Sequence, residues 1–260
     1  MSDDVSVKSI DAIAIELREE FIDATRDSLV KLDGIFEEMY REKITVDALI
    51  DATRRAIIPI SGQASNYNMY SLSTVALRLE DFLADVKNIS SNYVSECQKF
   101  LDMMMDIIEG RIASDADMAE LVRTLPAKAS FDETQVDVRD VEVLLVMLHG
   151  TSTHFVEREM QACGYRTSTL TSTFDALPQI VQTQPDMVII SAMMPNLSGI
   201  DLAVALSNMP ATRNVPCALI TSLDKDDMLL QFLPDSVPVI KKGPSFGDDL
   251  ADALSDLFLL

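Results

Sequence analysis

The chain has 260 residues, of which 48% are hydrophobic and 24% charged, and a formal net charge of −21. This composition excludes disorder throughout and leaves room for two domains with separate cores. The acidity disfavours binding to anionic nucleic acid, and no stretch approaches the ~20 apolar residues of a membrane span. The acidic N-terminus lacks the basic start and apolar run of a signal peptide, so we expect a cytoplasmic protein.

The first part of the chain is predicted to be helical. Apolar residues recur at three- and four-residue steps in four successive stretches: 10–39, 45–66, 71–87 and 91–112. Ser71 is the N-cap candidate of the third stretch. Pro59 predicts a kink or an early end of the second, since proline removes a backbone hydrogen bond. Four such helices without strands predict an all-α four-helix bundle at residues 1–112.

Residues 113–139 are predicted to be a linker, because small, polar and acidic residues dominate there; a short helix near 115–125 is compatible with them. After residue 140 the pattern alternates. Five apolar runs have strand length: 141–148, 165–170, 187–190, 216–221 and 237–240. Amphipathic segments follow them: 152–163, 173–182, 198–208, 223–232 and 246–258. This alternation predicts an α/β domain at 140–260, a doubly wound five-stranded parallel sheet with ligand chemistry at the carboxyl ends of the strands.

The three cysteines, Cys97, Cys163 and Cys217, lack the CxxC spacing of a zinc site, and their odd number does not indicate a disulfide framework. We expect them to be buried structural thiols, since free cysteine is among the most buried residue types.

A spaced motif runs through the third strand of the predicted sheet and the loop after it, with the key positions Pro185, Asp186, Met194, Pro195, Gly199 and Leu202. This motif resembles the receiver domain of bacterial response regulators, the CheY-like family. The resemblance extends to Thr221, which matches the switch threonine or serine, and to Lys242, which matches the family's lysine. The proline expected after that lysine is displaced to Pro244.

The resemblance implies a phospho-accepting aspartate at the position of Ser191 and an acidic pair within the segment Met147, Leu148 and His149. All three carboxylates are missing. A serine hydroxyl without a base is a poor nucleophile, and leucine or methionine cannot hold the Mg²⁺ that receiver chemistry needs. We therefore predict no catalytic residue, no metal and no cofactor. Thr221 and Lys242 are then remnants, and His149 and His154 are surface residues.

The helical part has a resemblance of its own, carried by Gly62, Leu72, Val75, Ala76, Leu79 and Glu80. These residues resemble a histidine-phosphotransfer (Hpt) domain. The resemblance places the phosphorylatable histidine at Ile58, or at Arg54 in the register of a sensor-kinase dimerisation helix. Residues 1–148 contain no histidine, so this inventory excludes phosphohistidine chemistry there.

These losses favour a non-catalytic protein of the two-component type, a pseudo-phosphotransfer bundle with a pseudo-receiver, which acts by binding or scaffolding without phosphorylation. The expected partners are a histidine kinase, a phosphotransfer protein or a response regulator. A homodimer could form through residues 237–240 and 257–260. One alternative is an atypical phosphotransfer protein that uses residues such as Ser191. Another is a small-ligand sensor that uses the emptied receiver pocket.

Overall fold

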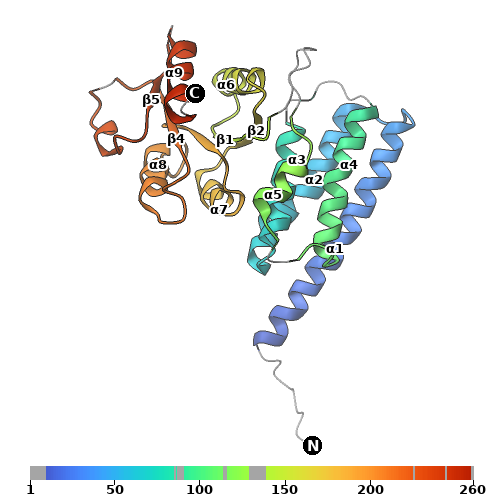
Figure 1. Ribbon diagram of the computed structural model, residues 1–260. Coiled ribbons are helices and arrows are strands. Elements are labelled where there is room, and N and C mark those ends of the chain that lie inside the picture. The colour runs from blue at the N-terminus through green and yellow to red at the C-terminus, as the bar shows by residue number, and fades with distance from the viewer. Residues whose placement is uncertain are drawn as a thin grey trace, which may run out of the picture. The chain divides into compact units, whose positions relative to one another are not determined.

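The computed structural model describes residues 10–84, 86, 91–113, 116–128, 139–224, 226–243 and 245–258. The chain divides into two compact units, Met1–Ala116 and Asp117–Leu260 (Figure 1). Within the described part of the chain, no helix combines the length and the apolar character that a membrane span requires.

The first unit is an all-helical bundle, as predicted. Its helices are α1 (Ile10–Tyr40), α2 (Val46–Ala64), α3 (Tyr70–Phe82) and α4 (Ser91–Ile108), with a 3-10 turn, η1 (Ser65–Tyr67), after α2. Contacts join α1 to α2, α2 to α3, α3 to α4 and α4 back to α1, which closes the bundle. The apolar residues predicted to lie on one face of the third helix are all buried: Leu72, Val75, Ala76, Leu79, Phe82 and Leu83.

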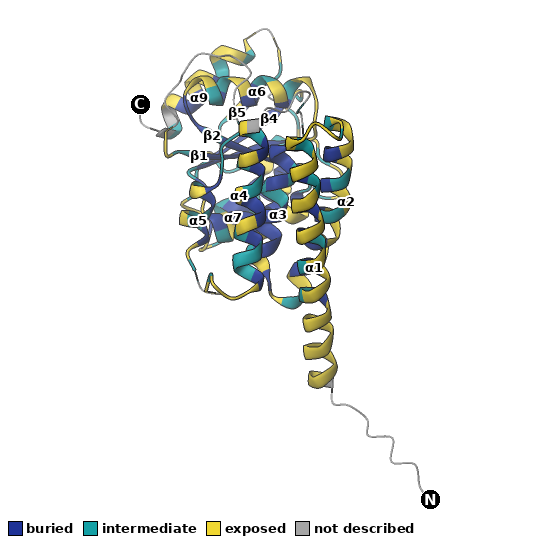
Figure 2. Ribbon diagram, turned by 90° about the vertical axis from the view of Figure 1, so that its right-hand side faces the viewer, coloured by how far each residue is buried: buried dark blue, intermediate teal, exposed yellow. Residues whose placement is uncertain are grey.

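The apolar stripe of α1 is buried only in its later part. Phe21, Leu29, Leu32 and Phe36 lie in the core, whereas residues 11–20 are all exposed (Figure 2). Length explains the difference: α1 has 31 residues against 19, 13 and 18 in its three partners, so at 1.5 Å per residue it is longer than the helices that could cover it.

One prediction about the ends of these helices is wrong, and one of the two alternatives for another is excluded. Ser71 is not the N-cap of α3, which begins at Tyr70 after Met69, a residue without a capping hydrogen bond. The helix α2 does not end early at Pro59 but continues to Ala64. Its residues on either side of the proline, Ile57 and Ile60, are buried, and this packing outweighs the one backbone hydrogen bond that proline removes.

The second unit is the predicted doubly wound sheet. All strand pairs are parallel, in the order β2-β1-β3-β4-β5. The strands are β1 (Glu142–Val146), β2 (Arg166–Leu170), β3 (Met187–Ser191), β4 (Cys217–Thr221) and β5 (Val239–Lys241). Helices α6 (Thr151–Ala162) and α9 (Phe246–Phe258) cover one face, and α7 (Thr173–Thr183) and α8 (Gly199–Asn208) cover the other (Figure 1). This strand order is that of flavodoxin-like folds.

The helix predicted over residues 223–232 is absent. The described part of this segment forms turns and a 3-10 helix, η2 (Leu230–Phe232). The Asp227 carboxylate accepts a hydrogen bond from the Leu229 N–H at 2.9 Å, a local bond that competes with helical pairing. Met228, Leu229 and Phe232 consequently stay exposed, at 75%, 50% and 71%.

Residues 117–128, which the sequence placed in the predicted linker, pack on the second unit. They contain the expected short helix, α5 (Met118–Thr124), whose N-cap Asp117 accepts hydrogen bonds from two backbone N–H groups. Arg166 of β2 donates to the carbonyls of Val122 (3.3 Å) and Leu125 (2.6 Å). Arg123 of α5 forms an ion pair with Asp186, at 3.0 Å. The segment therefore belongs to the amino-terminal edge of the sheet.

The prediction that the cysteines are buried holds for Cys97 and Cys217 and is wrong for Cys163, which follows α6 at the surface. Burial, aided by the negative charge of Glu96, raises the pKa of the Cys97 thiol to about 12, and burial also raises the pKa of Cys217.

We expect one thiol equivalent to react with an aromatic disulfide reagent at pH 8 in the folded protein, and three after unfolding. Cys163→Ser should remove the fast equivalent; reaction of a second native thiol would contradict this assignment.

Candidate functional site

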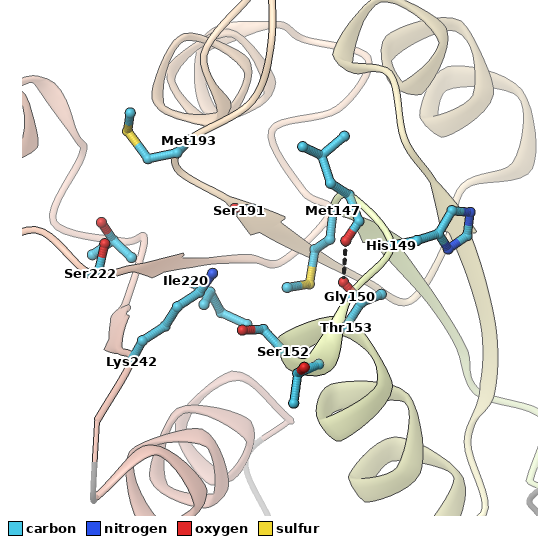
Figure 3. A pocket seen from close by; sticks show the side chains of 13 residues that line it. Met147, His149, Gly150, Ser152, Thr153, Ser191, Met193, Ile220, Ser222 and Lys242 are labelled. Carbon is cyan, nitrogen blue, oxygen red and sulfur yellow. Dashed lines mark hydrogen bonds between the residues drawn. The ribbon is translucent and has the colours of Figure 1, made fainter.

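A cavity of about 360 Å³ opens at the carboxyl ends of β1, β3, β4 and β5 (Figure 3). Parallel pairing brings these ends together, because Val146 pairs with Ile190 and Ser191 with Ile220 in the sheet register. Sheets of this kind place their ligand sites at this edge. The cavity brings together the six positions to which the resemblance gave a place in the phosphorylation site: Met147, Leu148, His149, Ser191, Thr221 and Lys242.

The end of β1 presents no carboxylate to the cavity. Met147 is 1% exposed and belongs to the core between the sheet and α6 and α9. The Leu148 carbonyl accepts a hydrogen bond from the Thr153 hydroxyl at 2.5 Å. The exposed His149 ring points away from Ser191 and Lys242 (Figure 3). Among the described residues, no group of three or more His, Cys, Asp or Glu side chains could hold a metal ion.

Ser191 ends β3, is 7% exposed and lines the cavity. Its surroundings are held by the main chain: Ala192 N–H donates to Ile220 O at 2.8 Å, and Gly199 N–H donates to Ala192 O at 3.0 Å. No side chain in the described ranges accepts or donates a hydrogen bond at Ser191 Oγ. Without a base beside it, this hydroxyl is not activated as a nucleophile.

Thr221 and Lys242 lie on the opposite wall. Thr221 is 1% exposed, and its Oγ1 accepts a hydrogen bond from the Leu223 N–H at 3.0 Å. The backbone N–H of Lys242 donates to the Thr221 carbonyl at 2.7 Å, which fixes the end of β5 against β4. From there the Lys242 side chain extends into the cavity (Figure 3).

The neighbouring Lys241 has a different role. Its ammonium pairs with the Asp224 carboxylate at 2.6 Å, and Lys241 does not line the cavity. The hydrogen bond and charge of Lys241 hold the pKa of the exposed Asp224 carboxyl below its ordinary value. Of these two lysines, Lys242 is the one that lines the cavity.

Sequence reasoning missed the hydroxyls that complete the wall: Thr151, Ser152 and Thr153 of α6, and Ser222 after β4. It also missed Met193, which is 63% exposed at the rim. Their position in the sequence could have revealed them, because each residue lies within a few places of a strand's carboxyl end or opens the following helix.

Ile58, the position implied for a phosphohistidine, lies in the first unit on α2 and is 52% exposed.

Part of the chain is similar to known response-regulator proteins. No protein-family model matches the chain. The chain is 33% identical over 69 residues to the response regulator PleD of Caulobacter vibrioides; the match covers 26% of this chain and 15% of PleD. The matched part is thus a small fraction of that relative's length.

Solved structures of receiver proteins match a larger share of the chain, 46% and 45% in the two examples that follow. The receiver domain of a signal transduction histidine kinase from Syntrophus aciditrophicus is 25% identical, with 46% of this chain and 90% of that chain covered and a TM-score of 0.41. A complex of the histidine kinase ThkA with the response regulator TrrA matches at 23% identity, with 45% and 97% covered and a TM-score of 0.39. The strand order of the second unit, β2-β1-β3-β4-β5, is that of the flavodoxin-like and CheY-like fold.

Proposed function

We propose that this protein is a signalling module of the two-component type that acts by binding other proteins and accepts no phosphoryl group. The observation that carries the proposal is the lining of the cavity, which includes Ser191 and the segment Met147, Leu148 and His149, where the receiver resemblance implies carboxylates. The protein is then not an enzyme, and its receiver-like unit is degenerate in chemistry while its fold is intact.

The chemical argument has two parts. Phosphoryl transfer needs a divalent cation to neutralise developing charge, and Mg²⁺ prefers oxygen ligands such as carboxylates. The thioether of Met147 and the side chain of Leu148 are not such ligands. Acyl phosphate formation also needs a carboxylate nucleophile, and Ser191 supplies a hydroxyl without a neighbouring base.

The first unit supports the same proposal. We assign it as a degenerate histidine-phosphotransfer bundle, in which Ile58 stands exposed on α2 where the histidine would be. Residues 1–148 contain no histidine, so a phosphohistidine cannot form there. Such a unit keeps a helical surface that can bind other proteins. The proposed partners for this surface are a histidine kinase, a phosphotransfer protein or a response regulator. The ThkA–TrrA complex is an example of a kinase that binds a receiver.

The test is phosphorylation of the full chain. Incubation with acetyl phosphate and Mg²⁺ is expected to leave the intact mass unchanged, whereas an active receiver treated in parallel gains one phosphate. Ser191→Asp is expected to stay unmodified as well, because restoring the nucleophile does not restore the Mg²⁺ ligands at Met147 and Leu148. A stable gain of one phosphate on the unaltered chain, lost in Ser191→Ala, would establish the alternative of an atypical phosphotransfer protein.

A further inference from the structure

We propose that the cavity at the carboxyl edge of the second unit binds a small organic anion, non-covalently and without a metal ion. The first argument is the sign of its charge. The chain carries a net charge of −21, yet no carboxylate is found among the described residues that line the cavity, whereas the ammonium of Lys242 lies there. Without carboxylates the cavity is a poor site for a divalent cation, and its ammonium favours an anion.

The ammonium of Lys242 is available for a ligand. No ion pair or hydrogen bond links its Nζ to the part of the chain that the structure describes, whereas Lys241 next to it is paired with Asp224. Lys242 is half-buried, so water can hydrate its ammonium only in part. An anionic group in the cavity would form a charge-assisted hydrogen bond there, which is stronger than a bond between neutral groups.

A second, independent observation is the hydroxyl of Ser191. More than nine-tenths of this residue is buried, it lines the cavity, and its Oγ has no partner within the described ranges. This hydroxyl is accessible from the cavity, where a ligand oxygen could form a hydrogen bond with it. Thr221 adds a second donor: its Oγ1 accepts from Leu223 N–H, which leaves its own O–H to donate.

The start of α6 also favours an anionic ligand in the cavity. Its N-cap is Gly150, which has no side chain to bond the first-turn amides, and Thr151, Ser152 and Thr153 line the cavity. Uncapped N–H groups and the helix dipole favour negative charge at this end. The helix end, the ammonium and the Ser191 hydroxyl therefore converge on one cavity.

The walls define the rest of the ligand. The volume of about 360 Å³ lies in the range of small-molecule sites and exceeds what a bare inorganic ion needs. Met147, Ile220 and Met193 line it with apolar atoms. The ligand class is thus a small anion with an apolar body, an organic phosphate or a carboxylate, whose anionic group lies at Lys242 and Ser191.

Titration calorimetry on the full chain in the presence of EDTA tests this proposal, with phenyl phosphate, benzoate and inorganic phosphate as probes. We expect at least one of the two aromatic anions to bind, and to bind more tightly than inorganic phosphate. Lys242→Gln should weaken binding about tenfold or more, because it removes a charged hydrogen-bond donor. Lys241→Gln is the matched control: it removes an equal charge one residue away and should leave affinity unchanged.

Variants of Ser191 provide the second part of this test. Ser191→Ala is expected to weaken binding about threefold to tenfold through loss of one neutral hydrogen bond. Ser191→Asp should abolish it, because a carboxylate there would compete for Lys242. Circular dichroism of each variant verifies the fold. Absence of binding by the unaltered chain, a requirement for Mg²⁺, or equal loss in Lys241→Gln and Lys242→Gln would each overturn the proposal. The proposal does not depend on which partner the protein binds.

Discussion

Replacing Gly199 by alanine is expected to destabilise the second unit by about 3 kcal/mol or more, as overpacking against an unyielding neighbour does. A Cβ at this position would lie 1.9 Å from the carbonyl oxygen of Ser191 and 2.8 Å from Cγ2 of Ile190. The oxygen is main chain of β3, which is held between β1 and β4, so it cannot move aside cheaply. Urea unfolding followed by circular dichroism measures the effect.

Gly247→Ala is the matched control in the same unit. The nearest atom to its added Cβ is Cζ of Phe155 at 3.7 Å, an ordinary contact, and alanine has the better helix propensity in α9. We expect this variant to change the free energy of unfolding by no more than about 1 kcal/mol. Equal stabilities of Gly199→Ala and Gly247→Ala would show that the loop before α8 yields and that Ser191 is less firmly held than described.

Arg166→Met is expected to lower the free energy of unfolding of the second unit by about 3–5 kcal/mol, the usual cost of removing one partner of a buried ion pair. The Arg166 guanidinium lies 3.3 Å from the carboxylate of Glu142, which is fully buried, and only 13% of the arginine side chain is exposed. The same guanidinium bonds the carbonyls of Val122 and Leu125. The loss should therefore also release α5, detected as faster amide exchange over residues 118–125.

Two further variants separate charge from packing. Arg213→Met removes an exposed arginine of the same unit and should change stability by less than about 0.5 kcal/mol. The double variant Glu142→Met with Arg166→Met should recover a substantial part of the loss, because apolar side chains can replace a buried pair. If the double variant is less stable than Arg166→Met alone, the buried charge of Glu142 is not the cause of the loss.

The local sequence pattern was sufficient to predict the helices and strands that pack against several other elements. The five strands and helices such as α7 were predicted within a few residues, because an apolar run or stripe is stable only when it is buried against a neighbouring layer. It failed over residues 223–232, where the apolar residues are spaced for a helix but Asp227 bonds the local backbone instead. It also failed at Ile13, Ile15 and Leu17, since a stripe does not reveal whether a partner helix is long enough to cover it.

The candidate site divides in the same way. The sequence by itself placed Ser191, Thr221 and Lys242 at or just after the ends of three strands, because spacing along the chain carries this information. Only the tertiary structure decided that His149 turns away, that Lys242 lines the cavity while Lys241 pairs with Asp224, and that the hydroxyls of α6 join the wall. Side-chain direction and charge pairing depend on atoms brought together from distant parts of the chain, and no local pattern encodes them.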